Sequence, residues 1–411
     1  MASFHNFVLL LLLTATLILV TEAAQERRRA IPSEEEKKEF ERQQLKAINK
    51  PAIKSFKTEQ GDIFDCINIH KQLAFDHHLL KNHSVQLKPT NAPEWITSNN
   101  ILWEADPLQY LQEEINCPDG TVIVKRTTMQ DLMLAKRLKS IGFNGPLNFL
   151  TERNNTDVTG PYYVATVNFG PSNFYGVKGN LNLWGPQVSQ DQMSGAFMAV
   201  AGGPKERFSS ISVGWMVSGS IAVPNLSISC SLIRILGCKF CITSKELVLM
   251  FLNFLSQQDH TTGALLQPVS VYNGTQYEIR LSLYQDLANG DWWFAYNDEN
   301  VGYWPASLFL DSGFDKRANY AAWGGQVYSP VTEKAPVMGS GNWPREGLSK
   351  AAYVNSIKVI TGFKKVIDPE INRLKARETS SKCYRTLYGN GDKEPWLRTL
   401  YYGGPAGCIE T

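Results

Sequence analysis

Apolar and polar residues alternate in short runs over most of the chain, from about residue 160 onward. The alternating runs are separated by Gly, Pro and Asn and cover residues 162–168, 177–184, 209–215, 276–284, 291–296 and 301–304. A period of two residues is typical of strands that bury one face. Many such strands between turn residues predict a mostly β domain, an antiparallel β-sandwich, over residues 155–411.

The start of the chain has a different pattern. Residues 7–20 form an apolar run, which is followed by the small and polar residues 21–24. The run is shorter than the roughly 20 apolar residues that span a membrane. We therefore interpret residues 1–24 as a secretory signal peptide, with an uncleaved anchor as the alternative, and expect no membrane association once the signal is removed.

A smaller α+β domain is predicted between the signal and the sandwich, over residues 25–145. Ser33 and Glu36 have the spacing of an N-capping box at the start of a charged helix. A second helical pattern covers residues 129–141. The polar stretch 143–157 is either a site where a propeptide is cut or an ordinary linker between domains.

Charge is nearly balanced, with 41 basic and 39 acidic residues, so nothing indicates a nucleic-acid partner. His70, His77, His78 and His83 lie in the smaller domain. No set of Cys or acidic ligands accompanies these histidines, and the side chains of adjacent residues normally point in different directions. We expect no metal and no cofactor.

Seven cysteines in a secreted chain imply disulfides and at least one remaining thiol. Cys66 and Cys117 are the only cysteines in the first half of the chain, so we expect them to pair. Acceptor sequons for N-glycosylation predict a glycoprotein. They are centred on Asn82, Asn154, Asn225 and Asn273.

Several motifs resemble those of the neprosin family, which are plant secreted glutamic peptidases that cut at proline. In the smaller domain, these motifs are Gln72-Leu-Ala-Phe-Asp-His-His78 and Cys117-Pro-Asp-Gly-Thr121. In the predicted sandwich, they are Met338-Gly-Ser-Gly341 and Glu346-Gly-Leu-Ser-Lys-Ala-Ala-Tyr353.

This resemblance implies a domain organisation and a location. Residues 25–145 would be a neprosin activation or propeptide-like domain, and residues 155–411 a peptidase-like β-sandwich. The resemblance also implies a C-terminal disulfide between Cys383 and Cys408, and a protein located outside the cell, in the apoplast.

Two strand motifs resemble the active-site strands of the family, each of which carries one catalytic glutamate. They are Ile211-Ser212-Val213-Gly214-Trp215 and Trp323-Gly324-Gly325-Gln326-Val327, where the family has Ile-Glu-Ala-Gly-Trp and Trp-Gly-Gly-Glu-Val. Ser212 and Gln326 thus match the two dyad positions. Neither is a carboxylic acid, whereas two apposed carboxylates supply the proton transfers of peptide hydrolysis. No nucleophile elbow surrounds Ser212 either. We expect the family activity, glutamic prolyl endopeptidase, to be absent.

Four aromatic residues near these motifs are expected to line a cleft suited to proline rings or sugars, with an ordinary core position as the alternative for each. They are Trp184, Trp215, Tyr303 and Trp304. A pseudopeptidase that binds proline-containing peptides or cell-wall glycoproteins is one candidate function. The other is a non-functional product of a decayed gene.

Residues 219–258 depart from the family pattern. They are strongly apolar and contain Cys230, Cys238 and Cys241, whose pairing stays open. Charged residues interrupt the apolar runs, so a membrane span is not expected. We interpret the segment as an atypical insert, or as sequence that is not native coding sequence, in which case strands would be lost from a sheet.

Overall fold

The structure is a computed structural model. It describes residues 33–59, 61–93, 96, 115–140, 162–204, 207–219, 227–231, 255–256, 263, 265–362, 365–389, 391 and 396–407. The chain divides into two compact units, Met1–Ala47 and Ile48–Thr411. The predicted signal peptide, the predicted domain boundary between residues 145 and 155, and most of residues 219–258 lie outside the described residues.

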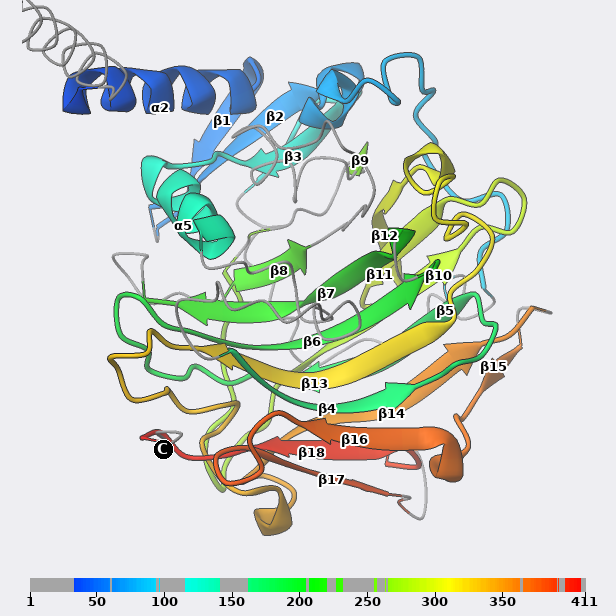
Figure 1. Ribbon diagram of the computed structural model, residues 1–411. Helices are drawn as coiled ribbons and strands as arrows, with labels where there is room; N and C mark the ends of the chain where they lie inside the picture. The colour runs from blue at the N-terminus through cyan, green and yellow to red at the C-terminus, as the bar shows by residue number, and fades with distance from the viewer. Residues whose placement is uncertain are drawn as a thin grey trace, which may run out of the picture. The chain divides into compact units, whose positions relative to one another are not determined.

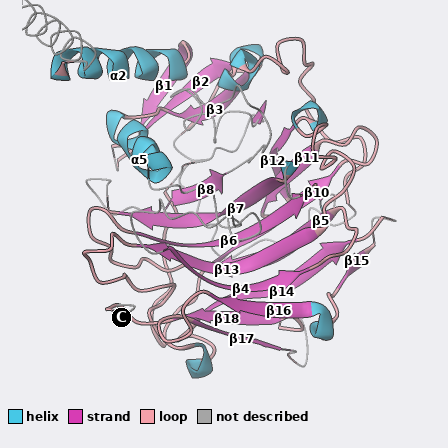
Figure 2. Cartoon of the chain, in the orientation of Figure 1, coloured by secondary structure: helices cyan, strands magenta, loops and turns pink. Residues whose placement is uncertain are grey.

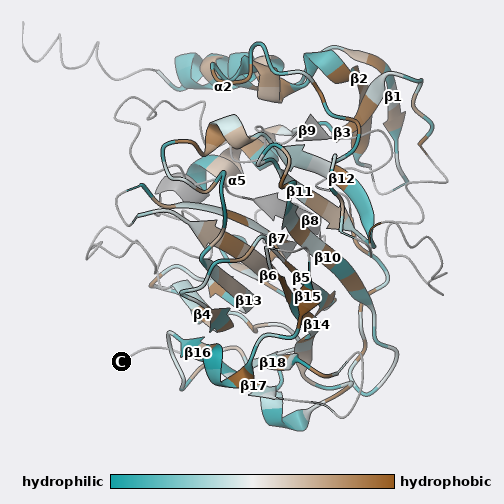
Figure 3. Cartoon of the chain, turned by 90° about the vertical axis from the view of Figure 1, so that its right-hand side faces the viewer, coloured by the Kyte–Doolittle hydropathy of each residue, from teal (hydrophilic) through white to brown (hydrophobic). Residues whose placement is uncertain are grey.

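The described part of the first unit is Ser33 and helix α2 (Glu34–Ile48) as far as Ala47. The predicted capping box at its start is confirmed. The Glu36 N–H donates to Ser33 Oγ at 3.1 Å, and the Ser33 N–H donates to Glu36 Oε2 at 2.7 Å. These bonds satisfy backbone donors that a helix start leaves without intrahelical partners. The helix is mainly hydrophilic, as Figure 3 shows, so its formation depends on capping and charge rather than on a buried stripe.

A three-stranded antiparallel sheet begins the second unit. Its order is β1 (Ala52–Lys57), β2 (Ile63–Asn68) and β3 (Thr121–Lys125). Helix α5 (Met129–Ser140) follows β3 and agrees with the helical pattern predicted from residue 129. Together these elements form the smaller α+β region that the sequence predicts.

Two larger antiparallel sheets make up the rest of the unit, and their strands are labelled in Figure 1. The described strands of the first sheet are, in order, β16 (Leu374–Glu378), β4 (Tyr162–Phe169), β13 (Tyr320–Tyr328), β6 (Met193–Gly202), β7 (Ser209–Ser218) and β8 (Ser227–Ser231). We call this the six-stranded sheet.

The second large sheet has nine described strands, and Figure 2 shows how strands dominate the unit. Its order is β17 (Arg385–Gly389), β18 (Thr399–Gly403), β14 (Ala352–Ile360), β5 (Gly176–Asn182), β10 (Glu278–Gln285), β11 (Trp292–Tyr296), β12 (Glu299–Trp304) and β9 (Leu255–Ser256), with β15 (Val366–Ile367) paired to β14. Short 3₁₀ helices cover Ile69–Lys71, Leu73–Asp76, Ala306–Leu308, Pro344–Glu346 and Ile371–Arg373. The predicted mostly β class and antiparallel sandwich are confirmed.

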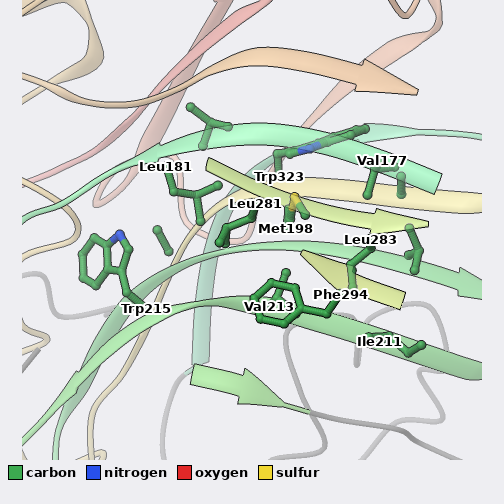
Figure 4. Packing of buried hydrophobic residues seen from close by; sticks show 14 of the residues in the cluster. Val177, Leu181, Met198, Ile211, Val213, Trp215, Leu281, Leu283, Phe294 and Trp323 are labelled. Atoms are coloured by element: carbon green, nitrogen blue, oxygen red, sulfur yellow. The ribbon is translucent and has the colours of Figure 1, made fainter. Parts of the chain in front are cut away.

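The main hydrophobic core lies between the two large sheets, and Figure 4 shows part of it. Met198, Val213 and Trp323 from the six-stranded sheet meet Leu281 and other apolar residues from the nine-stranded sheet, and all of these side chains are essentially inaccessible to solvent. Alternate positions on each strand supply this layer, which is the reason that the sequence alternates with a period of two.

Two adjacent glycines on β13 are required by close approaches within the protein. Gly324 has a φ of 149°, and a Cβ there would meet the carbonyl oxygen of Ala165 on β4. A Cβ at Gly325 would meet the ring of Tyr402 on β18. Both glycines of the Trp-Gly-Gly motif therefore have a structural cause, namely strand pairing for the first and packing between sheets for the second.

Two short strands, β8 and β9, come from the atypical segment 219–258. β8 pairs with β7 over Ser212–Met216, and β9 pairs with β12 at Gly302 and Tyr303. Each is the last strand in the order of its sheet. The described part of this segment thus covers sheet edges instead of leaving them unpaired. None of the described helices is both long and apolar enough to cross a membrane.

Candidate functional site

Ser212 and Gln326 lie on one face of the six-stranded sheet. Strand β6 separates the strands that carry them, because β13 and β7 pair with its two edges. Gln326 is opposite Gly195, and Ser212 is opposite Ala199. Directly paired residues share a face, as do residues two or four apart on one strand, so all four positions share one face. We call it the dyad face.

The register keeps the two positions apart. They differ by two strand spacings and by four residues along β6. In a flat sheet this offset places their Cα atoms about 10 Å apart across the strands and about 14 Å apart along them, or about 17 Å in all. The Ser212 side chain ends one bond beyond Cβ, so it spans little of this gap. The present residues are therefore poorly suited to hold one water between them.

Gln326 is held by a tyrosine on the neighbouring strand β4. The Tyr162 hydroxyl donates to Gln326 Oε1, and burial raises the pKa of Tyr162 well above its usual value, which keeps that hydroxyl protonated. Gln326 and Ser212 are 6% and 3% exposed. The side-chain carbonyl of Gln326 is thus engaged inside the protein, on the side of β13 that faces away from β7.

The rest of the dyad face offers no carboxylate or imidazole among the residues that the structure describes. Lys375 and Arg377 on β16 are its cations, paired with Asn168 and Thr166. Phe197 lies in the row between those of Ser212 and Gln326 and packs in a small apolar cluster. The other positions of β4, β13, β6 and β7 on this face are Tyr162, Val164, Tyr320, Ala322, Gly324, Tyr328, Met193, Gly195, Ala199, Ala201, Ser210, Gly214, Met216 and Ser218, and β8 adds positions 227, 229 and 231.

The four aromatic residues expected to line a cleft do not share one surface. Trp215 is three residues from Ser212, so it lies on the opposite face of β7, inside the core (Figure 4). Its Nε1–H donates to the Asn182 carbonyl oxygen at 2.9 Å, and the Trp184 Nε1–H donates to Asn182 Oδ1. Trp304 packs in the same core. Trp184, Trp215 and Trp304 therefore lie in the interior of the sandwich.

Tyr303 has a different environment, which the sequence did not indicate. Its hydroxyl lies 2.8 Å from His83 Nε2 and accepts a bond from the Gln86 N–H at 2.9 Å. Both partners belong to the region before the sandwich, more than 200 positions earlier in the chain. Tyr303 is therefore a contact residue between the smaller region and the nine-stranded sheet.

Buried carboxyl groups exist elsewhere, in the nine-stranded sheet. Burial raises the pKa of Asp291, in the turn between β10 and β11, to about 6, and nearby Asp286 adds to the effect. Burial also raises the pKa of Glu278, which accepts bonds from Asn180 Nδ2 at 2.9 Å and Asn355 Nδ2 at 3.1 Å. None of these groups lies on the dyad face, so none replaces its missing acids.

The cysteines and sequons are placed in part. Cys66 and Cys117 form a disulfide, with their Cα atoms 5.5 Å apart, as predicted. Cys383 is disulfide-bonded, while Cys408, Cys238, Cys241 and the Cys230 side chain lie outside the described residues. Asn82 and Asn273 are exposed, and Asn154 and Asn225 are outside the described residues.

The described histidines do not assemble into a metal site. His77 and His78 stack with ring centroids 4.7 Å apart, and His83 contacts Tyr303. Over the described ranges, no three His, Cys, Asp or Glu side chains converge in a way that could hold a metal ion.

The fold and the dyad face define a peptidase-like β-sandwich protein with an N-terminal activation region. The neprosin family model matches residues 253–405, and the model described as neprosin activation peptide matches residues 55–166. The chain is therefore a member of the neprosin family that carries the activation peptide of that family. Gln326 lies within the first match, whereas Ser212 lies outside both.

Two solved peptidases show a distant similarity. Scytalido-glutamic peptidase with a peptide-based transition-state analog is 7% identical, with a TM-score of 0.30, and the alignment covers 60% of this chain and 100% of that one. SCP-B, a member of the Eqolisin family in complex with the tripeptide Ala-Ile-His, gives the same identity, TM-score and coverage. The fold assignment rests on the strands and registers described above.

Proposed function

We propose that this neprosin-family protein is a pseudopeptidase, a catalytically silent relative of glutamic post-proline endopeptidases. One observation carries the proposal. The described residues of the dyad face include no aspartate, glutamate or histidine, and the two positions that match the family dyad hold Ser212 and Gln326.

Hydrolysis of a peptide bond needs a base that takes a proton from water and an acid that gives one to the leaving nitrogen. Gln326 can do neither, and its Oε1 already accepts the Tyr162 hydroxyl. A serine needs a neighbouring base to act as nucleophile. Loss of one such group commonly lowers the rate by about 10²–10⁴-fold, and loss of a whole catalytic unit by about 10⁶-fold.

The dyad face retains buried polar side chains beside the dyad positions. Ser210 and Ser212 carry hydroxyls on the dyad face, and Asn168 carries an amide. We extend the proposal to binding of proline-containing peptides or cell-wall glycoproteins outside the cell. The Cys66–Cys117 disulfide and the exposed sequons at Asn82 and Asn273 support an oxidising, secretory location.

The first experiment measures cleavage of a proline-containing peptide at acid pH by mass spectrometry. The native chain should be silent, and the Ser212→Glu, Gln326→Glu double variant should cleave after proline. Each single variant is the matched control, since it supplies only one carboxylate and should stay silent. Post-proline cleavage by the native chain would overturn the proposal.

A second experiment separates a binding module from a non-functional product. Calorimetry with a proline-rich peptide should give saturable binding to the native chain, and a peptide with alanine at every proline should not bind. Equal heats for the two peptides would exclude proline-directed binding. Absence of both cleavage and binding in a chain that unfolds cooperatively would favour a product without function.

A further inference from the structure

We propose that the activation region, residues 48–140, is a permanent part of the folded protein and stays bound to the sandwich after the chain is cut between residues 140 and 162. A segment described as an activation peptide could be released by such a cut. The contacts described below favour retention. They involve the nine-stranded sheet, so this inference is independent of the chemistry on the dyad face.

The activation region and the sandwich share one hydrophobic core. Phe64, Leu80 and Ile115 belong to the same cluster of buried residues as Trp292 and Phe294 of the nine-stranded sheet. Phe64 and Leu80 are completely inaccessible to solvent. Release of the region would return this apolar surface to water, and the hydrophobic effect opposes that change.

Tyr303 on β12 is the centre of a polar contact with the region. Its hydroxyl bonds His83 Nε2 at 2.8 Å and the Gln86 N–H at 2.9 Å, and its ring stacks on Trp293 with centroids 4.6 Å apart. The tyrosine is fully buried. Burial lowers the pKa of His83 and raises that of Tyr303, so both groups stay neutral at pH 7. Removal of the region would leave this hydroxyl without either partner.

A second polar contact lies at the adjacent hairpin. The Thr90 N–H donates to Asp286 Oδ2 at 2.6 Å, and Asp286 Oδ1 accepts the Ala288 N–H at 3.0 Å. Asp286 is fully buried, and these two bonds satisfy one carboxylate oxygen each. A hydrogen bond to a buried carboxylate is stronger than one between neutral groups. The contact therefore anchors the segment that follows Gln86.

The similarity to the activation peptide also extends into the sandwich. The matched residues end at 166, inside β4, which pairs with β13 on one edge and β16 on the other. A cut at the end of the match would break a strand within the six-stranded sheet. A cut before residue 162 leaves that sheet whole.

The positions of the cysteines allow a clear test. No disulfide would join the piece before the cut to the piece after it. Cys66 and Cys117 pair with each other and are the only cysteines before residue 162. The other five cysteines lie after it. Any association of the pieces after the cut would be noncovalent.

The experiment places a site for a sequence-specific protease between residues 150 and 151 of the full chain. After cutting, the two pieces should elute together from a size-exclusion column at the position of the uncut chain, and should separate only in denaturant. Elution as two separate peaks under native conditions would overturn the proposal, whatever the outcome of the cleavage assay with peptide substrates.

Matched variants test the contacts themselves. Tyr303→Phe removes a hydroxyl with two partners and should speed dissociation of the cut pieces roughly 10- to 30-fold. Tyr284→Phe is the control, because the Tyr284 hydroxyl donates to Asn300 within the sandwich. Equal dissociation rates for the two variants would contradict the assigned role of Tyr303.

A second pair of variants tests the proposal if the Tyr303→Phe protein does not fold. Thr90→Pro removes the N–H that Asp286 accepts, whereas Thr90→Ala keeps it, and Thr90 is exposed. The proline variant should dissociate faster than the alanine variant. Identical rates would show that this contact does not hold the activation region.

Discussion

Replacement of Asp291 by Asn should remove part of the pH dependence of stability. Burial raises the pKa of Asp291 from 3.8 to about 6. Its Oδ1 accepts the Ala306 N–H at 2.7 Å, while Oδ2 has no hydrogen-bond partner among the described residues. The folded state therefore holds the proton of this group more tightly than the unfolded state does.

The sign and magnitude of the effect on stability follow from the difference between the folded and unfolded pKa values of Asp291. A group whose folded pKa is raised stabilises the fold when protonated, below about pH 4, and loses this contribution as the pH rises through about 6. The difference between 3.8 and about 6 corresponds to about 3 kcal/mol, at about 1.4 kcal/mol for each pKa unit. The amide side chain that Asp291→Asn introduces would keep an acceptor for the Ala306 N–H and would carry no charge at any pH.

The assay is denaturant unfolding at pH 4 and pH 7.5. Asp291→Asn should be more stable than the native chain at pH 7.5, by up to about 3 kcal/mol, and nearly equal to it at pH 4. Asp311→Asn, at an exposed position, is the control and should show no such pH-dependent difference from the native chain. A difference between Asp291→Asn and the native chain that is the same at both pH values would refute the reasoning.

Three further predictions concern other parts of the structure. Tyr162→Phe should lower the free energy of unfolding by about 1–3 kcal/mol, since it leaves the buried Gln326 Oε1 without that donor, and thermal unfolding measures the loss. Replacing Cys66 and Cys117 by serine should cost about 4 kcal/mol, because the disulfide closes a loop of 51 residues, and denaturant unfolding of the double variant against the native chain measures this. Asn273→Gln should remove the mass of one glycan from protein made in a secretory host, because the exposed turn presents this sequon, and an unchanged mass would show that Asn273 is not used.

Local sequence patterns were sufficient for the class of fold. The alternation between Ser209 and Trp215 predicted a strand, which is β7 in the structure. The spacing of Ser33 and Glu36 predicted the capping box of α2. These features were predictable because strand faces and helix caps depend on residues only a few positions apart. The pairing of Cys66 with Cys117 was also predictable, because the first half of the chain contains no other cysteine.

The composition of the candidate site followed from the sequence, but its surroundings did not. The motifs alone showed that Ser212 and Gln326 lack carboxyl groups. The aromatic cleft was expected partly because Trp215 is close to Ser212 in sequence, although three positions along a strand put the two side chains on opposite faces. The bond from Tyr162 to Gln326 has no sequence signal, since it joins residues 164 positions apart.

By itself, the sequence determined the apolar N-terminal pattern, the period-two alternation typical of a β-sandwich, and the family motifs. It also determined which residues stand at the two dyad positions. Only the tertiary structure decided that β6 lies between the two dyad strands, and that His83 and Gln86 bond Tyr303. Strand order and register depend on contacts between distant segments. Such contacts form only where the whole fold offsets the entropy of bringing those segments together, so local patterns cannot encode them.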